Sequence, residues 1–252
     1  MAELKELIEY LDRYLRVAEI PDYAGAYNGL QVASRSPVDR IAGAVDACQE
    51  SIEAAVGQGA QLLLVHHGLF WGDPLPVTGR SYRRLRALFE ADLAVYSAHL
   101  PLDVHPRVGN NVLLAGALGF PVEGRFGTHQ GLEGLGVWTA ADLPREKLAE
   151  RLEKACGTRP IVVPGGPAHV RRLGIVTGAA ASLLPQARAE GLDTFITGEG
   201  SHHTYHDAME WGMNLMYAGH YATETFGVRA LAGHLAEEYG LEWSFLDNPT
   251  GL

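Results

Sequence analysis

The chain has 252 residues, of which 47% are hydrophobic and 20% are charged, and its formal net charge is −10. The composition is ordinary for a globular protein, and the negative charge argues against a general nucleic-acid or anionic-membrane binder. Cys48 and Cys156 lie far apart, outside any metal-type spacing. We recognise no signal peptide and no apolar run long enough to cross a bilayer, so we expect a cytoplasmic protein.

The N-terminal part of the chain predicts a helix, a loop, a strand and a second helix. Residues 3–17 carry leucine and isoleucine at helical spacing, which indicates one buried stripe. Residues 27–32 contain Asn-Gly, and we interpret them as a turn and a packed loop. A strand is expected over residues 41–45 and a helix over residues 49–58.

The most informative stretch follows, where the apolar residues 62–65 lead directly into His66, His67 and Gly68. Four apolar residues in a row are typical of a strand covered on both faces, and the glycine permits a sharp exit. Open α/β sheets bind ligands at the carboxyl ends of such strands. A single histidine there is more often a structural residue, but two in tandem favour a metal site.

A loop rich in proline and glycine over residues 71–79 could form the wall of a site. Residues 80–90 predict a helix that carries Arg80, Arg83, Arg84 and Arg86. We interpret these arginines as a solvated face, with a phosphate-binding patch as the alternative.

The rest of the chain continues the alternation of strands and helices. A strand over residues 93–98 ends at His99, and a helix is expected over residues 108–118. Residues 120–170 carry weaker signals, for strands at 135–139 and 161–163 and a helix at 144–156. Further strands are expected at 173–177, 194–197, 215–219 and 242–246, and further helices at 180–190, 201–211 and 223–239. The whole pattern predicts an α/β fold with mostly parallel sheets.

Two pairs of segments indicate an internal duplication. At an offset of 132 residues, His67 corresponds to Glu199; at an offset of 121, His99 corresponds to His220 and Asp103 to Glu224. We therefore predict two related α/β lobes, residues 1–125 and 126–252. They would pack as one compact unit, with the site in the cleft between them.

Five residues at strand ends, or in the turns after them, are candidate metal ligands: His66, His67, Asp103, His220 and Glu224. Three imidazoles and two carboxylates suit two divalent ions such as zinc, manganese or iron. Such a pair can activate water and stabilise both oxygens of a hydrolytic step. His99 is a candidate partner of a ligand or a sixth ligand, and Glu199 could orient a ligand imidazole or act as a base; a solvent-facing carboxylate is the alternative for Glu199.

Other histidines give weaker signals. On the expected helix over residues 201–211, His202 and His206 share a face, whereas His203 does not. They could bind substrate or lie on the surface. We assign structural roles to His105, His129, His169 and His234.

Six motifs carry a family resemblance: residues 28–32 (NGLQV), 66–71 (HHGLFW), 99–103 (HLPLD), 110–111 (NN), 197–199 (TGE) and 219–224 (GHYATE). With these motifs in order along nearly the whole chain, the sequence resembles the NIF-three-like dinuclear metal-centre proteins, often labelled GTP cyclohydrolase I type 2 homologues. The resemblance implies the same five ligands, two related lobes without an inserted domain, and a homohexamer built as a dimer of trimers.

The leading functional hypothesis is a metal-dependent hydrolase acting on a small nucleotide-like or phosphorylated substrate, with GTP cyclohydrolase-type activity as one candidate. The alternative is a metal-stabilised ring that acts as a scaffold or binds single-stranded nucleic acid or a regulator, which the net charge disfavours. Metal storage or insertion is a third hypothesis, without a supporting motif.

Overall fold

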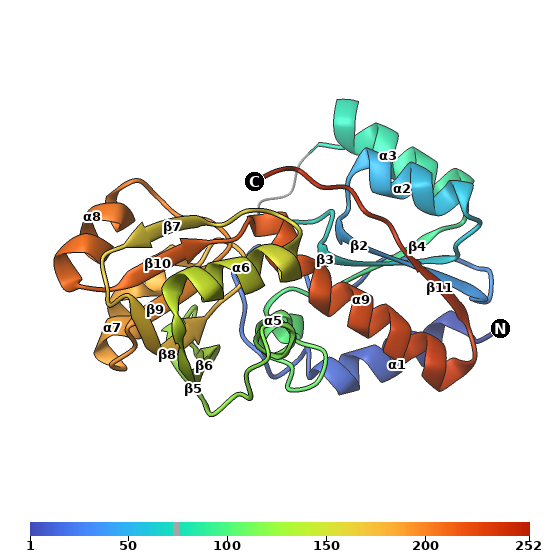
Figure 1. Cartoon of the computed structure of the whole chain (residues 1–252). Helices are drawn as coiled ribbons and strands as arrows, with labels where there is room; N and C mark the ends of the chain where they lie inside the picture. Colours follow the sequence, from blue (N-terminus) through green and yellow to red (C-terminus); the bar gives the residue numbers. More distant parts are fainter. Residues whose placement is uncertain (73–75) are drawn as a thin grey trace. The chain divides into compact units, whose positions relative to one another are not determined.

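The computed structural model describes residues 1–72 and 76–252 (Figure 1). Residues 73–75, inside the predicted loop over residues 71–79, lie outside the described part. Contacts divide the chain into two compact units. Unit 1 consists of Met1–Leu102 and Gly227–Asn248, and unit 2 of Asp103–Phe226 and Pro249–Leu252. The expected lobes, 1–125 and 126–252, stay a prediction.

Unit 1 contains a five-stranded sheet in the order β1-β4-β3-β2-β11. Its strands are β1 (Gly29–Val32), β2 (Arg40–Asp46), β3 (Leu62–His67), β4 (Ala94–Ser97) and β11 (Glu242–Phe245). Strands β2, β3, β4 and β11 run parallel, whereas β1 pairs with β4 in antiparallel. The expected loop over residues 27–32 is therefore wrong, because its backbone pairs with the edge of the sheet.

Helices cover both faces of this sheet (Figure 1). They are α1 (Leu4–Leu15), α2 (Gln49–Gly57), α3 (Gly79–Glu90) and the later part of α9 (His220–Tyr239). Ile52 of α2 and Leu88 of α3 pack with Ala42, Leu63 and Val95 on one face. Val228 and Ala232 of α9 approach Gly43 on the other, where a side chain on the strand would meet them at 3.4 Å.

Unit 2 contains a six-stranded sheet in the order β5-β6-β8-β9-β10-β7. Its strands are β5 (Gly124–His129), β6 (Leu132–Pro144), β7 (Ile161–Pro164), β8 (His169–Ile175), β9 (Thr194–Thr197) and β10 (Asn214–Tyr217). Strands β8, β9 and β10 are parallel, and the other three pairings are antiparallel. Both sheets are thus mixed, which corrects the prediction of mostly parallel sheets.

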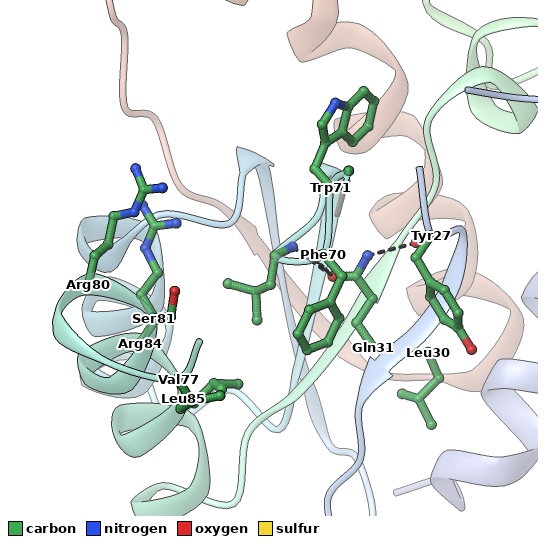
Figure 2. A pocket seen from close by; sticks show the side chains of 12 residues that line it. Tyr27, Leu30, Gln31, Phe70, Trp71, Val77, Arg80, Ser81, Arg84 and Leu85 are labelled. Carbon is green, nitrogen blue, oxygen red and sulfur yellow. Dashed lines mark hydrogen bonds between the residues drawn. The ribbon is translucent and has the colours of Figure 1, made fainter. Parts of the chain in front are cut away.

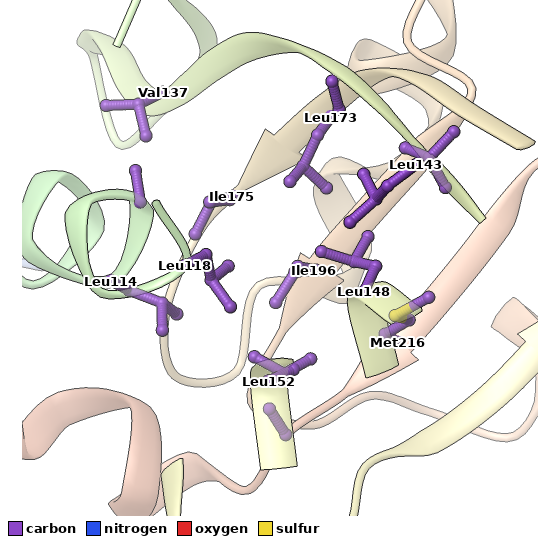
Figure 3. Packing of buried hydrophobic residues seen from close by; sticks show 14 residues of the cluster. Leu114, Leu118, Val137, Leu143, Leu148, Leu152, Leu173, Ile175, Ile196 and Met216 are labelled. Carbon is purple, nitrogen blue, oxygen red and sulfur yellow. The ribbon is translucent and has the colours of Figure 1, made fainter. Parts of the chain in front are cut away.

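Helices α5 (Asn110–Ala117) and α6 (Arg145–Cys156) cover one face of the unit 2 sheet. Figure 3 shows Leu114, Leu148 and Leu152 packed against Ile196 and Met216 of the strands. The remaining helices of this unit are the 3-10 helix η1 (Ala181–Leu183), α7 (Leu184–Ala189) and α8 (His203–Trp211). The short α4 (Leu100–Asp103) has only its last residue in unit 2. α7 contacts β5, and α8 contacts β7 and β10.

The same local arrangement occurs in each unit: three consecutive strands lie side by side and parallel, β2-β3-β4 in unit 1 and β8-β9-β10 in unit 2. Parallel neighbours bring their carboxyl ends to one edge of the sheet, where α/β proteins place their ligands. Each unit therefore offers one such edge. Among the described residues, no helix is both long enough and apolar enough to span a membrane.

Candidate metal centre

His66 and His67 end β3, the central strand of unit 1, and their rings are oriented by oxygen acceptors. His66 is fully buried, and its Nδ1 lies 2.9 Å from the backbone oxygen of Ala98. A carbonyl oxygen can only accept, so Nδ1 of His66 carries the proton and donates. In the neutral ring, Nε2 of His66 then keeps its lone pair, which is the atom that a metal needs.

His67 is held by a carboxylate on the neighbouring strand. Nδ1 of His67 lies 2.8 Å from Oδ1 of Asp46, and the two residues are direct partners in the register of β2 and β3. Because a carboxylate accepts, Nδ1 of His67 donates and Nε2 of the neutral ring is left as the acceptor.

His99 follows β4 and is fixed by a loop from the N-terminal part of the chain. Nδ1 of His99 lies 2.8 Å from Oδ1 of Asp22, and its backbone N–H donates to Oδ1 of Asn28 at 2.7 Å. Asp22 also accepts from Asn28 and from the backbone of Leu100. Burial raises the pKa of Asp22, but the bonds from His99 and Asn28 outweigh it and lower the pKa. Asp22 is therefore an ionised carboxylate that holds the ring.

The three histidines form a cluster at the carboxyl edge of the unit 1 sheet. One ring nitrogen from each of His66, His67 and His99 lies within 4.8 Å of those of the other two. The ring of Trp71 meets the rings of His67 and His99 edge-on, with centroids 6.0 and 4.8 Å apart. Three converging imidazoles, two of them held by carboxylates, are a donor set that fits a divalent ion such as zinc.

Unit 2 places a histidine between two carboxylates. His220 and Glu224 occupy the first turns of α9, and Nε2 of His220 lies 3.1 Å from Oε2 of the buried Glu224. Nδ1 of His220 lies 2.9 Å from Oε1 of Glu199, which follows β9. Burial lowers the pKa of His220, but Glu224 and Glu199 outweigh it and raise the pKa to about 9. Two carboxylates around one imidazole form a negative environment that a cation would neutralise.

Glycines allow the backbone of unit 2 to approach this histidine closely. A Cβ on Gly198 would lie 2.7 Å from Cα of His220, and a Cβ on Gly178 would lie 2.1 Å from Oε1 of Glu224. Gly178 and Gly219 also have positive φ angles, of 68° and 88°. The turns after β8, β9 and β10 therefore require glycine to bring His220 and its partners together.

Asp103, the last residue of α4, is a buried carboxylate of unit 2. Its Oδ1 accepts a hydrogen bond of 2.8 Å from Nδ2 of Asn110 at the start of α5. A buried carboxylate with this support is a suitable ligand for a divalent cation.

The structure thus places the predicted residues in two groups, one in each unit. Unit 1 brings together His66, His67 and His99, and unit 2 brings together His220, Glu224 and Glu199 and buries Asp103. Sequence reasoning missed Asp22 and Asp46, which hold two of the rings. Asp46 could have been found, because it directly follows the apolar residues of the predicted strand before the histidine strand. Asp22 lies in a loop, and no sequence pattern marks it.

The other histidines have different surroundings. The rings of His202 and His206 lie 5.5 Å apart on α8 and line a cavity of about 620 Å³ in unit 2, together with Arg159, Tyr205 and Glu199. Nε2 of His169 lies 2.6 Å from the exposed Asp142, and Nε2 of His234 lies 2.6 Å from the hydroxyl of Tyr10.

Fold and site together define an α/β protein with mixed sheets and buried histidine and glutamate groups that could hold metal ions. Residues 2–250 match the family described as Duf34/NIF3 (NGG1p interacting factor 3). The chain therefore belongs to the Duf34/NIF3 family, and the resemblance drawn from its motifs is confirmed.

Relatives match over nearly their full length. A Deinococcus radiodurans protein named GTP cyclohydrolase 1 type 2 homolog is 46% identical, over 98% of this chain and 94% of its own. A Halobacterium salinarum protein of the same name is 44% identical, over 98% of this chain and 100% of its own. Among solved structures, the crystal structure of TTHA1606 from Thermus thermophilus superposes with a TM-score of 0.90 over 99% of this chain and 100% of that chain. The sequence identity between the two chains is 43%.

Proposed function

We propose that the chain is a metal-dependent hydrolase that holds two divalent ions through His66, His67, Asp103, His220 and Glu224. The observation that carries this proposal is shared by the three histidines of the set. In each, Nδ1 is bonded to an oxygen, of Ala98, Asp46 and Glu199 respectively. Metal-binding histidines show this pattern, because the bond at one nitrogen orients the other toward the ion.

The chemistry of the five side chains suits divalent ions. Three imidazoles and two carboxylates supply five ligand atoms or more, of the kinds that zinc, manganese and iron accept, and an ion would displace the second proton that His220 carries between Glu199 and Glu224. When bound, such ions act as Lewis acids that activate water and stabilise the charge on a leaving oxygen.

The residues around the ligands have defined tasks in this proposal. Glu199 holds the proton on Nδ1 of His220, so Nε2, which lies 3.1 Å from Glu224, is the nitrogen that would bind an ion once its proton is displaced. Asp46 likewise holds the proton on Nδ1 of His67. His99, anchored by Asp22 within the histidine cluster, is a candidate for a further ligand or for a group that contacts the substrate.

For the substrate, we propose a small nucleotide-like or phosphorylated molecule, and GTP cyclohydrolase-type ring opening is one candidate reaction. The name GTP cyclohydrolase 1 type 2 homolog, carried by the relatives from Deinococcus radiodurans and Halobacterium salinarum, supports this class. Because related sites on one fold serve different reactions, a screen of nucleotides for hydrolysis is the appropriate assay.

Elemental analysis of gently purified protein tests the metal centre. We expect about two metal ions per chain. His67→Ala in unit 1 and Glu224→Gln in unit 2 should each reduce this content. His203→Ala is the matched control, because this exposed histidine lies outside the cluster. Full metal content in both ligand variants, or full hydrolysis by metal-free protein, would overturn the proposal.

We also propose that the chain assembles with itself as a hexamer, built as a dimer of trimers. Edge strands support self-association: β7 ends the unit 2 sheet with Ile161 68% exposed, and β11 ends the unit 1 sheet with Trp243 43% exposed. Exposed apolar side chains on edge strands, which have one unpaired side, favour association. Light scattering after size exclusion should give six times the mass of one chain; a monomer mass would contradict this assembly.

A further inference from the structure

Unit 1 contains a cavity of about 450 Å³ between β1 and the first turns of α3, next to the segment that follows His67. Figure 2 shows Arg80, Ser81 and Arg84 of α3 on one side and Tyr27, Leu30 and Gln31 on the other, with Phe70 between them. A volume of this size is typical of sites for small molecules.

One wall of the cavity is positively charged. Arg80 and Arg84 lie one turn apart on α3, and the lining residues that the structure describes include no aspartate or glutamate. Within the described residues, Nε of Arg84 is buried without a hydrogen-bond partner. Burial, followed by the charge of Arg80, lowers the pKa of Arg84. An anion in the cavity would accept from both guanidinium groups and reduce their repulsion.

The other walls carry aromatic rings that face solvent. Tyr27 is 60% exposed, Phe70 45% and Trp71 44%. Large exposed aromatic side chains gathered around one cavity are characteristic of a binding site, because each ring offers a flat face to a ligand.

Hydrogen bonds of Gln31 hold one wall of the cavity in place. The side chain of Gln31 donates to the backbone oxygen of Tyr27 at 2.7 Å and accepts from the backbone N–H of Leu69 at 2.7 Å (Figure 2). These bonds tie β1 to the segment that carries Phe70 and Trp71. A preorganised wall reduces the entropy lost on binding.

We propose that this cavity binds a small aromatic anion of the size of a nucleoside monophosphate, with its anionic group on Arg80 and Arg84 and its ring against Phe70. Trp71 lines the cavity and also meets the rings of His67 and His99. The bound molecule would therefore lie beside the histidine cluster. That this molecule is the substrate rests on the proposed function, but its binding does not.

Calorimetric titration of the full chain with adenosine monophosphate, inorganic phosphate and adenosine tests the proposal. We expect the nucleotide to bind more tightly than either part alone. The Arg80→Gln/Arg84→Gln variant should bind it at least about tenfold more weakly. Arg83→Gln is the matched control, because this exposed arginine of the same helix does not line the cavity.

A second variant separates the ring from the anion. Phe70→Leu should weaken binding of adenosine monophosphate by about threefold or more and leave inorganic phosphate unchanged. Equal binding by wild type and the double arginine variant would overturn the proposal, as would no binding of any probe.

Repeating the titration after treatment with a chelator distinguishes this proposal from the metal proposal. Nucleotide binding that survives the chelator and needs the two arginines supports the cavity, even if elemental analysis finds no metal. Binding that is lost with the metal and is indifferent to the arginines would overturn the cavity and leave the metal centre standing.

Discussion

At the scale of single residues, the orientation of each histidine depends on an acid or carbonyl from another segment. Asp22 and His99, for example, are 77 residues apart in the chain. The sequence predicted histidines and carboxylates at strand ends, because apolar runs mark the strands and polar residues follow them. It could not predict which carboxylate holds which ring, since that depends on how loops fold over the sheet edge.

Asp46 should act as a positioning residue for His67. In Asp46→Asn the negative charge behind Nδ1 of His67 is lost, which makes Nε2 a poorer ligand. We expect metal affinity to fall by about tenfold to a hundredfold. Competition with a chromophoric chelator measures this change, and Asp39→Asn, an exposed aspartate next to the N-terminus, is the control. Equal affinities in the two variants would show that Asp46 has no such role.

Cys156 should be an unreactive thiol in the folded chain. It packs against the core cluster of unit 2, and burial raises its pKa to about 12. In Cys48→Ser, which leaves Cys156 as the single thiol, we expect alkylation at pH 8 to be roughly a thousandfold slower than in denaturant. Mass spectrometry measures the rate.

The same pKa sets the direction of a stability effect. The pKa of an exposed thiol is near 9, and the pKa of Cys156 in the folded chain lies above it. Burying the neutral thiol therefore contributes its full amount to the free energy of unfolding below pH 9. This contribution is lost as the pH rises from about 9 toward 12. Rapid alkylation in the native state at pH 8 would contradict both expectations.

At the scale of elements, the sequence located the buried parallel strands and most helices, but it misjudged the edges. Strands β2, β3, β9 and β10 consist of apolar or buried residues and were predicted within one or two residues. β1 was expected as a loop and β5 was missed, because the pairing of a short edge strand depends on backbone hydrogen bonds that leave little trace in the side-chain pattern. These antiparallel edges make both sheets mixed.

The turn after β9 should tolerate no side chain at Gly198. A Cβ there would lie 2.7 Å from Cα of His220 and 2.8 Å from the backbone oxygen of Gly178. Gly198→Ala should therefore lower the free energy of unfolding by about 1 to 3 kcal/mol. Gly116→Ala is the control, because this position on α5 faces open space and should gain about 0.5 to 1 kcal/mol. Urea denaturation measures both, and equal stability of the two variants would contradict the packing described here.

At the scale of the whole molecule, the order of the motifs along the chain predicted the family, which the comparisons confirm. The same pattern does not indicate that a late segment of the chain packs with the N-terminal part. Gly227–Asn248 belongs with the N-terminal part of the chain, because β11 pairs with β2 and the later part of α9 covers Gly43. A partner so distant in sequence has no local signature.

Bound metal should stabilise the whole chain. A metal ion present at a hundred times its dissociation constant adds about 2.7 kcal/mol to the free energy of unfolding. For a chain of this size, that corresponds to a rise in Tm of several degrees. Differential scanning fluorimetry with zinc and with a chelator measures the shift, which His67→Ala should reduce and His203→Ala should keep. An identical Tm in zinc and chelator would contradict the prediction.

The pairing of β11 with β2 also has a consequence for synthesis on the ribosome. The two strands are separated by about 200 residues, and translation at 5 to 20 residues per second needs roughly 10 to 40 s to cover that distance. During this interval the backbone groups of β2 that will pair with β11 have no partner strand. A strand with one unpaired side is a target for chaperones and for aggregation, so the yield of folded protein should depend on translation speed and on holdase capacity.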